Sequence, residues 1–443
     1  MNFVPILLLY CCNVVLSSDK KSVEVDGDIL LGGLFPVHAA DLASDACGIL
    51  NPERGVQRVE AMLFTLDKIN NDPKILPGLK LGASIWDTCS SDQKALQHSL
   101  TFIEMQAGEQ QCSNSQQKQK GKKFYRGVVG GSYSSVSIMV SNLLGLFSIP
   151  QISYASTSPA LSLKTTHKLF ARTVPSDLTQ AKAMAKLVKK FNWTYVSTVR
   201  SEGDYGDAGM LAFKDEAKKL NVCIASNDVI KKTSTKEEII GIARELTKES
   251  NKARTVVVFL RIEDAERLLS AVTNVIEGRN SSNLVWVASD GWGQENGPVE
   301  HNSVAARGAL TIEINSKSIK EFENYYGNLT LNNNKRNPWF KELWEKTFNC
   351  STDTQRSDRE SCQKFADVPL KEKLGKSFKH ESKIQFIVQA IYAFARTLDK
   401  QFGLNCAAYN QSKAMCLQKL ANISGQAFYQ EMMALGSTGF GEL

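Results

Sequence analysis

The 443-residue sequence lacks the short motifs that mark common catalytic and metal centres. It contains no Gly-x-Ser-x-Gly, His-Glu-x-x-His or Cys-x-x-Cys motif, and its five histidines lie far apart without motif context. The absence of Cys-x-x-Cys pairs leaves a zinc site without support. We therefore expect that the protein is not an enzyme and that it has no metal site and no cofactor.

Long apolar runs and strongly basic faces are also scarce. The richest later apolar stretch, 138–152, is broken by polar residues and Pro150, so it falls short of the roughly 18 apolar residues that span a bilayer. The formal net charge is +7, and the densest basic patch, 118–126, lies in a Gln/Ser/Gly-rich stretch. A solvated loop is the expected structure there, which argues against nucleic-acid binding. If the protein works at a membrane, we expect its anchor outside this chain.

Residues 1–18 carry the first positive signal. An apolar run ends in Ser17 and Ser18, and charged residues begin at Asp19. This layout predicts a secretory signal peptide, although no Lys or Arg precedes Lys20. The alternative is a buried strand or helix of a cytosolic protein.

Cysteines and glycosylation acceptors fit secretion. Cys11 and Cys12 would leave with the signal peptide, so that eight of the ten cysteines remain. Two pairs, Cys350 with Cys362 and Cys406 with Cys416, close short loops, Cys47 and Cys89 flank a helical pattern that they could staple, and Cys112 and Cys223 have no obvious local partner. Acceptor triplets for N-glycosylation occur at Asn192, Asn280, Asn328, Asn349, Asn410 and Asn422.

Strand-like and helix-like segments alternate along most of the chain. Apolar runs predict strands, and apolar residues at helical spacing predict the helices between them. The expected strands are 29–36, 79–87, 127–130, 151–154, 194–199, 222–225, 255–260 and 284–288. The expected helices are 55–71, 94–107, 134–147, one from Asp177 as a helix cap, 206–220, 235–249, 263–275 and 382–400. Regular alternation of this kind indicates an α/β fold with parallel sheets covered by helices on both faces.

So many strands exceed one sheet, and we predict two doubly wound lobes. The chain should cross to the second lobe near 171–177 and return near 308–318, and the helix at 382–400 should rejoin the first lobe. Ligands of open α/β sheets bind beyond the carboxyl ends of the strands. The crevice between the two lobes is therefore the expected binding site.

Polar residues follow four of the expected strands. Gly130–Ser135 (GGSYSS) opens a helix and suits an anion such as a carboxylate, although a plain helix cap is as good an explanation. Ala155–Thr157 is a second hydroxyl-rich turn, and Tyr205 and Asp290 follow two further strands. An Asp and a Tyr ring together can hold an ammonium group, although each alone is more often a turn residue.

Three basic residues complete the candidate site. Arg54 and Arg58 lie one helical turn apart, and Lys383 begins the apolar helix at 382–400. Converging on the crevice, they would bind a second carboxylate, although exposed charges of this kind are usually only solvated. Tyr205, Asp290 and Lys383 also have side chains capable of acid–base catalysis, but the sequence supplies no nucleophile or metal to accompany them.

Long ordered segments of this chain resemble the amino-terminal domain of metabotropic glutamate receptors, a family of class C G protein-coupled receptors. The resemblance spans about residues 29–425. It is carried by GGLFPVH (32–38), RGVQRVEAMLFTLDKIN (54–70), GVVGGSYSSVSI (127–138), IPQISYASTSP (149–159), FARTVPSD (170–177), FNWTYVSTV (191–199), SEGDYG (201–206), WVASDGW (286–292), NPWF (337–340) and ESKI (381–384). Arg54, GGSYSS and RIEDAERLL (261–269) bring it nearest to the group II subtype. The implied fold is the Venus-flytrap clamshell, which is the periplasmic-binding-protein type I plan.

The resemblance assigns roles to the candidate residues. Ser134 and Thr157 would hold the α-carboxylate of L-glutamate. The backbone of Ala155, with Asp177, Tyr205 and Asp290, would surround the α-ammonium. Arg54, Arg58 and Lys383 would bind the distal carboxylate, and Tyr133 and Arg261 would line the site.

The resemblance also implies a covalent framework and missing modules. Cys47–Cys89, Cys350–Cys362 and Cys406–Cys416 would be internal disulfides, and Cys112 would join two copies into a homodimer. Cys223 would pair with a cysteine-rich module that is absent from this chain, as are the seven-helix membrane bundle, which couples to a G protein, and the last strands of the first lobe. The expected division is a signal peptide (1–18), the first part of lobe I (19–175), lobe II (176–310) and a truncated second part of lobe I (311–443).

Three candidate functions follow. The first is the glutamate-binding domain of a receptor on the extracellular face of the plasma membrane, which closes on glutamate to trigger signalling in the full-length protein. The alternative is a secreted, truncated glutamate-binding decoy without signalling of its own. An extracellular enzyme that uses the same crevice is the third and weakest candidate.

Overall fold

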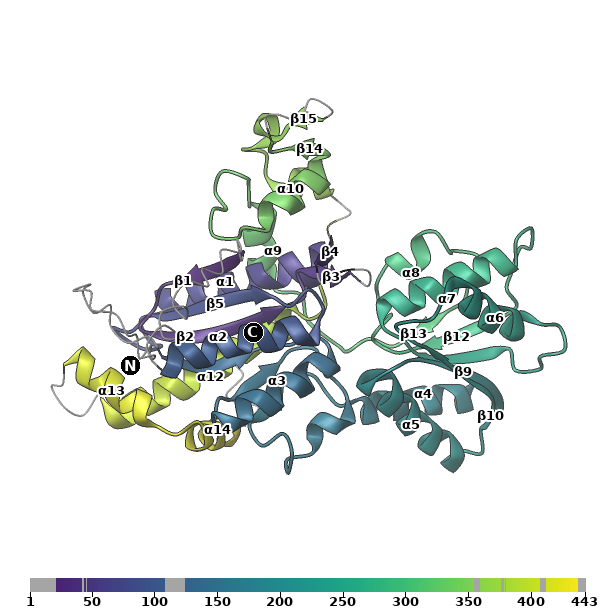
Figure 1. Ribbon diagram of the computed structural model, residues 1–443, viewed down its shortest axis with the longest axis horizontal. Coiled ribbons are helices and arrows are strands. Elements are labelled where there is room, and N and C mark those ends of the chain that lie inside the picture. The colour runs from purple at the N-terminus through teal and green to yellow at the C-terminus, as the bar shows by residue number, and fades with distance from the viewer. Residues whose placement is uncertain are drawn as a thin grey trace, which may run out of the picture.

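The computed structural model describes residues 21–41, 44, 46–107, 124–353, 359–375, 378, 380–406 and 412–436. These residues form two α/β lobes, each built on its own mainly parallel sheet (Figure 1). The expected signal peptide, Cys112 and the acceptor Asn410 lie outside the described residues.

Lobe I contains a six-stranded sheet in the order β1-β5-β2-β6-β7-β8. Only β1 runs antiparallel to its neighbour, β5; the other pairs are parallel. The strands are β1 (Ser22–Val25), β2 (Ile29–Phe35), β5 (Leu81–Asp87), β6 (Tyr125–Val129), β7 (Gln151–Ser153) and β8 (Phe170–Arg172). Every residue of β2 and β5 is buried, as expected of parallel strands covered on both faces.

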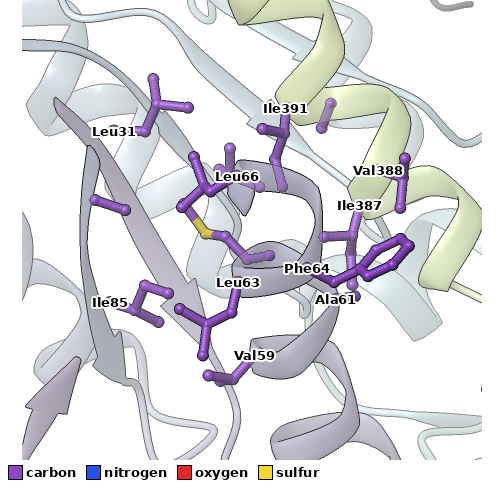
Figure 2. Close-up of a cluster of buried hydrophobic side chains, with 14 of the residues drawn as sticks. Leu31, Val59, Ala61, Leu63, Phe64, Leu66, Ile85, Ile387, Val388 and Ile391 are labelled. Carbon is purple, nitrogen blue, oxygen red and sulfur yellow. The ribbon is translucent and has the colours of Figure 1, made fainter. Parts of the chain in front are cut away.

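Side chains of β2 alternate between two cores. Leu31 and Phe35 belong to the larger core with α1 (Arg58–Asn71) and α12 (Ile384–Asn405), whereas Leu30 and Leu34 pack with α2 (Asp92–Ala107) and α3 (Ser134–Leu146). Figure 2 shows α1 side chains filling the space between the sheet and α12. The alternation follows from the two-residue period of a strand, so one short apolar run supplies both faces.

Lobe II contains a five-stranded parallel sheet in the order β10-β9-β11-β12-β13. In β11, Val256 and Val258 face one core, while Val257 and Phe259 face the other. The elements are β9 (Tyr195–Ser201), β10 (Cys223–Ile230), β11 (Thr255–Phe259), β12 (Val285–Ala288), β13 (Leu310–Thr311), and the covering helices α4 (Asp177–Lys190), α5 (Asp204–Lys219), α6 (Lys236–Thr247), α7 (Ile262–Val275) and the short α8 (Gly297–Glu300). The prediction of an α/β fold with two doubly wound lobes is confirmed.

The chain passes between the lobes where β8 leads to α4 and where β13 leads to α9 (Lys320–Gly327). In Figure 1 the segment from α9 through α10 (Phe340–Phe348) to β14 (Cys350–Ser351) and β15 (Glu360–Ser361) projects from lobe I. Beyond α12, the helices α13 (Lys413–Asn422) and α14 (Gly425–Ala434) also belong to the lobe I core. The remaining elements are β3 (His38–Ala40), β4 (Cys47–Leu50), α11 (Leu370–Leu374) and the short helices η1 (Pro52–Gln57), η2 (Pro159–Ser162) and η3 (Cys362–Phe365).

Three disulfides confirm the expected pairing, with Cα–Cα distances of 5.1, 5.0 and 5.4 Å for Cys47–Cys89, Cys350–Cys362 and Cys406–Cys416. Cys223 is an exposed free thiol. Five of the glycosylation acceptors, Asn192, Asn280, Asn328, Asn349 and Asn422, are exposed, and their modification stays a prediction. Among the described residues, no helix combines the length and apolarity that a membrane crossing requires.

Some expected boundaries are wrong for local reasons. Asp177 is not the cap of α4: Ser176 has the extended backbone of a cap and its hydroxyl accepts from the Leu178 amide, so Asp177 is the first helical residue. The predicted helix at 55–71 begins instead as a π-helix, η1, before α1 starts at Arg58. The strand expected at 222–225 extends to Ile230, because β10 stays paired with β9 beyond a register shift.

Candidate functional site

A cavity of about 340 Å³ lies between the two lobes. This volume is at the lower end of the range of small-molecule pockets. Lobe I contributes Arg54, Arg58, Asp92, Ser132, Tyr133, Ser134, Ser135, Ala155, Thr157, Glu381, Ser382 and Lys383. Lobe II contributes Ser201, Glu202, Gly203, Asp204, Tyr205, Lys232, Arg261, Asp290, Gly291 and Glu295, and the connection that returns from β13 to lobe I contributes Glu313.

The topology explains why these residues meet. The residues 132–135 follow β6, 155–157 follow β7, 201–205 end and follow β9, Arg261 follows β11, and Asp290 follows β12. The carboxyl ends of parallel strands lie at one edge of each sheet, where open α/β proteins bind their ligands. Each lobe therefore presents its strand-end residues to the same cavity.

The first part of the cavity wall is rich in hydroxyl groups. Ser134 and Thr157 are each 3% exposed, and the Ser134 hydroxyl accepts from the Ser158 amide at 3.2 Å. Helix α3 begins at Ser134, and the first amides of a helix have no partner within it and carry a partial positive charge. This end of the cavity suits a carboxylate.

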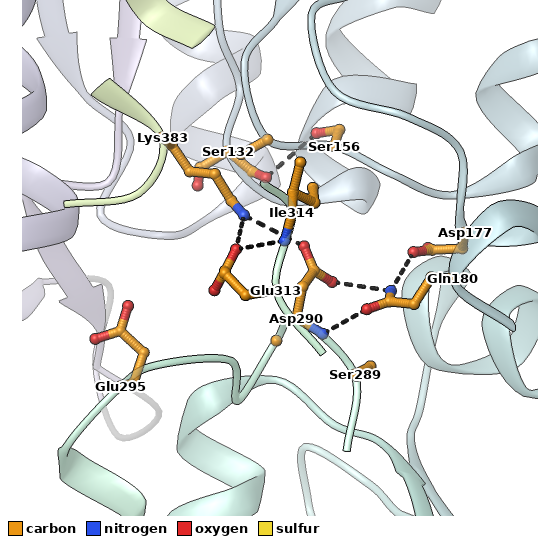
Figure 3. Close-up of polar contacts among 12 residues, drawn as sticks. Ser132, Ser156, Asp177, Gln180, Ser289, Asp290, Glu295, Glu313, Ile314 and Lys383 are labelled. Atoms are coloured by element: carbon orange, nitrogen blue, oxygen red, sulfur yellow. Dashed lines mark hydrogen bonds and ion pairs between the residues drawn. The ribbon is translucent and has the colours of Figure 1, made fainter. Parts of the chain in front are cut away.

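The second part of the wall is acidic and is built in lobe II. The Tyr205 hydroxyl donates to Asp290 Oδ1 at 2.9 Å and accepts from the Gly291 amide at 3.0 Å. Gln180 fixes Asp290 further, because its side-chain amide donates to Asp290 Oδ1 at 3.1 Å and its oxygen accepts from the Asp290 amide at 2.7 Å (Figure 3). A carboxylate next to an aromatic ring is suited to an ammonium group.

Asp177 lies behind this acidic wall. It is 1% exposed, and its Oδ1 accepts from Gln180 Nε2 at 2.9 Å, so Gln180 links it to Asp290. Its Oδ2 is buried and has no hydrogen-bond donor among the described residues. Burial and the neighbouring Asp290 carboxylate raise the pKa of Asp177 to about 8. A cation bound near Asp177 would therefore ionise this carboxyl group.

The third part of the wall is basic. Arg58 donates from Nη1 to Ser132 Oγ at 2.7 Å and from Nη2 to Glu381 Oε1 at 2.6 Å. Lys383 Nζ lies 2.7 Å from Glu313 Oε1 and 3.5 Å from Asp290 Oδ2 (Figure 3). Burial alone would lower the pKa of Lys383, but Asp290 and Glu313 outweigh it and raise the pKa above its ordinary value. Both bases are therefore cationic.

Three further lining residues, Arg54, Tyr133 and Arg261, make polar contacts with the protein. Arg54 Nε donates to Glu295 Oε1 at 2.9 Å, and its Nη2 donates to the Gly291 carbonyl at 3.2 Å. The Tyr133 hydroxyl donates to Glu263 Oε1 at 2.8 Å. Arg261 caps α7 and pairs with Asp264 at 3.0 Å. The Arg54 and Tyr133 contacts join the two lobes directly.

The structure brings most of the residues predicted for the site into one cavity. Arg54, Arg58, Tyr133, Ser134, Ala155, Thr157, Tyr205, Arg261, Asp290 and Lys383 line it. Asp177 does not line it, but Gln180 links it by hydrogen bonds to the lining residue Asp290. The roles of these residues toward a ligand stay predictions.

Sequence reasoning missed the acidic partners of the basic groups. Glu295, Glu313 and Glu381 line the cavity, and Glu263 accepts from the hydroxyl of the lining residue Tyr133. Three of them stand in segments already singled out: Glu263 in 261–269, Glu381 beside Lys383 in the ESKI segment, and Glu313 in the predicted return connection. The available signal was the requirement that buried cations be neutralised.

The described residues contain one group with metal-ligand chemistry, formed by His38, Cys47 and Asp87. Cys47 is bound to Cys89 in a disulfide, so it has no thiolate to offer. The two ring nitrogens of His38 contact Asp87 at 2.5 Å and Glu342 at 3.1 Å. This group is explained as a structural contact and supports no metal site.

Two doubly wound lobes with a small polar cavity between their strand ends define a ligand-binding protein of the periplasmic-binding-protein type I class. The family model described as "Receptor family ligand binding region" matches residues 57–430. The chain therefore belongs to this family, which is a family of receptor ligand-binding regions and not of enzymes.

Curated relatives are similar over most of this chain. The chain is 43% identical over 415 residues to the "Metabotropic glutamate receptor" of Drosophila melanogaster, covering 88% of this chain and 42% of the relative. It is 43% identical over 389 residues to "Metabotropic glutamate receptor 4" of Macaca fascicularis, and 42% identical to that of Mus musculus; each alignment covers 85% of this chain and 42% of the relative. The chain thus spans about two fifths of the length of these relatives.

The expected likeness to the group II subtype is not supported. The two vertebrate relatives named above are both receptor 4, which belongs to group III. Arg54 and the segments GGSYSS and RIEDAERLL are too short to outweigh identity spread over 389 residues. The membership of the chain in a subtype is therefore not assigned.

Proposed function

We propose that this chain is the extracellular L-glutamate-binding domain of a metabotropic glutamate receptor homologue. The observation that carries the proposal is the convergence of three chemically different walls on one cavity: hydroxyls at a helix N-terminus, an acidic group with Tyr205, and the basic groups of Arg54, Arg58 and Lys383. Glutamate, which appears in the names of these relatives, has an α-carboxylate, an α-ammonium and a distal carboxylate. Each wall complements one of these groups.

In this proposal, the α-carboxylate binds at the N-terminus of α3 with Ser134 and Thr157. The α-ammonium lies between the Ala155 backbone, Tyr205 and Asp290, with Asp177 contributing through Gln180. The distal carboxylate binds to the basic groups, for which arginine is suited because its guanidinium forms two parallel hydrogen bonds with a carboxylate.

Closure of the lobes is the proposed response to binding. The hydroxyl wall belongs to lobe I, whereas the Tyr205 and Asp290 wall belongs to lobe II. A ligand that contacts both walls stabilises the closed arrangement over the open one by its differential affinity for the two. Glutamate has about ten non-hydrogen atoms, and small ligands reach about 1.5 kcal/mol per atom, so micromolar affinity is physically allowed.

The wider receptor functions belong to the same proposal. We propose a signal peptide at 1–18, a homodimer joined through Cys112, and a place at the extracellular face of the plasma membrane. Cysteine-rich and seven-helix membrane modules, with G protein coupling through them, would belong to the full-length receptor. We further propose lobe boundaries at 175/176 and 310/311, with 311–443 returning to lobe I. The alternative of a secreted decoy has the same binding site and differs only in the absence of signalling.

Calorimetric titration of the secreted chain tests the proposal. We expect saturable binding of L-glutamate and none of glycine or L-alanine, which lack the distal carboxylate. Circular dichroism and a cooperative thermal transition establish in the same sample that the chain is folded. A folded chain that does not bind glutamate would refute the ligand assignment.

A further inference from the structure

Each of the three bases that would receive the distal carboxylate already has a protein carboxylate. Arg58 pairs with Glu381, Lys383 with Glu313 and Asp290, and Arg54 with Glu295. Seven acidic and five basic side chains line the cavity. An incoming acidic side chain therefore meets an acidic surplus and has to replace one of these partners.

The three ion pairs differ in the free energy that their separation costs. Arg58 and Glu381 are each 3% exposed in their side chains, and the Glu381 amide is held by Gln57 Oε1 at 2.7 Å. Breaking this pair would leave a charge in the interior without compensation. Lys383 is 7% exposed and has two acidic neighbours, so the loss of one leaves the other.

The pair of Arg54 and Glu295 is different. The two side chains are 19% and 21% exposed, so water can solvate either partner after separation. Arg54 lies in η1 of lobe I, whereas Glu295 lies in the loop after β12 of lobe II. Figure 3 shows Glu295 set apart from the cluster around Lys383. Of the three pairs, this one costs least to exchange and is made only where the lobes approach.

We propose that Glu295 is a tethered competitor: in the empty protein it occupies the place on Arg54 that the acidic side chain of the ligand takes in the complex. The proposal rests on the proposed function and adds to it a specificity-determining residue. A contact that is made only in the empty state lowers the free energy of that state alone, so it weakens the binding of any ligand that must break it. A ligand with a neutral side chain leaves the pair in place.

Glu295 would thereby set how strongly the site prefers an acidic to a neutral amino acid. L-Glutamate and L-glutamine have nearly the same size and shape and differ in the charge of the side chain. Removing the charge of Glu295 weakens its pairing with Arg54, so that the glutamate carboxylate replaces it more easily, and also removes repulsion between two carboxylates. Glutamine gains neither effect.

The test uses the full secreted chain with Glu295→Gln, which keeps the shape and the hydrogen-bonding oxygen of the side chain. Glu300→Gln is the matched control, because Glu300 is an exposed acidic residue five positions further on and does not line the cavity. We expect Glu295→Gln to lower the Kd for glutamate about three- to tenfold and the Kd for glutamine less than about twofold. Glu300→Gln should change both less than about twofold.

A second readout does not depend on glutamate. Because Arg54–Glu295 joins the lobes, small-angle scattering of the ligand-free chain should show a larger radius of gyration for Glu295→Gln than for wild type or Glu300→Gln. An unchanged radius, or glutamate affinity equal to or below that of wild type, overturns the role of Glu295. If the wild-type chain binds no glutamate at all, the proposed function fails, and the scattering comparison alone then decides whether the empty-state contact exists.

Discussion

Arg58 and Glu381 are 323 positions apart in the sequence, yet Arg58 Nη2 lies 2.6 Å from Glu381 Oε1. Both side chains are 3% exposed, so the two charges neutralise each other in the interior of lobe I. The Glu381 carboxylate also accepts from the Lys383 amide at 2.9 Å. One buried carboxylate thus orients both a base on α1 and the start of α12.

We expect Arg58→Ala to lower both stability and affinity. The substitution leaves Glu381 buried without its partner, which typically costs about 3–5 kcal/mol in the free energy of unfolding. It would also remove the proposed hydrogen bonds from Arg58 to the distal carboxylate, so glutamate affinity should fall at least about tenfold. Urea denaturation and calorimetry measure the two effects.

Arg336→Ala is the control for this prediction, because Arg336 forms an exposed pair with Asp67 and lies outside the cavity. Its loss should cost at most about 1 kcal/mol. The double variant Arg58→Ala/Glu381→Gln should be more stable than the sum of the single changes predicts, because the uncompensated charge is gone. Unchanged glutamate affinity in Arg58→Ala would refute the distal-carboxylate site.

Ligand binding should release a proton at neutral pH. With a pKa of about 8 in the empty protein, the Asp177 carboxyl is mostly protonated at pH 7, and a bound ammonium favours its ionised form. Affinity should therefore rise as the pH increases from about 6 to 8. Titrations in phosphate and in Tris, whose ionisation enthalpies differ, should give different apparent enthalpies. Asp177→Asn should remove the difference, and equal enthalpies in wild type would contradict the prediction.

Stability should depend on the protonation of His38. Burial alone would lower its pKa, but hydrogen bonds to Asp87 and Glu342 outweigh burial and raise the pKa to about 9. A raised folded-state pKa contributes stability that is complete below the unfolded value of about 6.5 and is lost as the pH rises through about 9. The contribution is on the order of 3 kcal/mol.

Thermal unfolding of wild type and His38→Gln between pH 6 and 10 measures this contribution. The difference in Tm between the two should be largest at pH 6 and should shrink toward pH 10. His301→Gln, at an exposed position, is the control. A Tm difference that does not vary with pH would show that the contact acts through packing alone.

Two helical glycines should respond oppositely to alanine. A Cβ on Gly206 would lie 1.9 Å from the Ser201 carbonyl oxygen, and backbone cannot yield as a side chain can, so α5 and the adjacent Tyr205 must shift. We expect Gly206→Ala to cost about 1–3 kcal/mol and to weaken ligand binding. Gly241, in α6, has open space at this position, so Gly241→Ala should stabilise the chain by about 0.5–1 kcal/mol. Chemical denaturation compares both with wild type, and a stable Gly206→Ala with unchanged binding would contradict the steric argument.

The sequence by itself determined the layered plan of this protein. Buried runs such as Ile29–Phe35 and Thr255–Phe259 supply apolar side chains to both faces, which only a sheet covered twice can accommodate. Strand-end residues such as Tyr205 and Asp290 could be found because parallel strands bring their carboxyl ends to one edge. The Cys350–Cys362 and Cys406–Cys416 disulfides could be predicted from the sequence because each pair closes a short loop.

Only the tertiary structure decided which charges face each other. The edge strands β8 and β13 have three and two residues, too few for a periodic pattern, and their pairing depends on a neighbouring strand already in place. Glu295 and Glu381 reach Arg54 and Arg58 from positions 241 and 323 residues away in the sequence. No local pattern encodes such a partner, because the pairing depends on how β12 and α12 pack and on how closely the lobes approach.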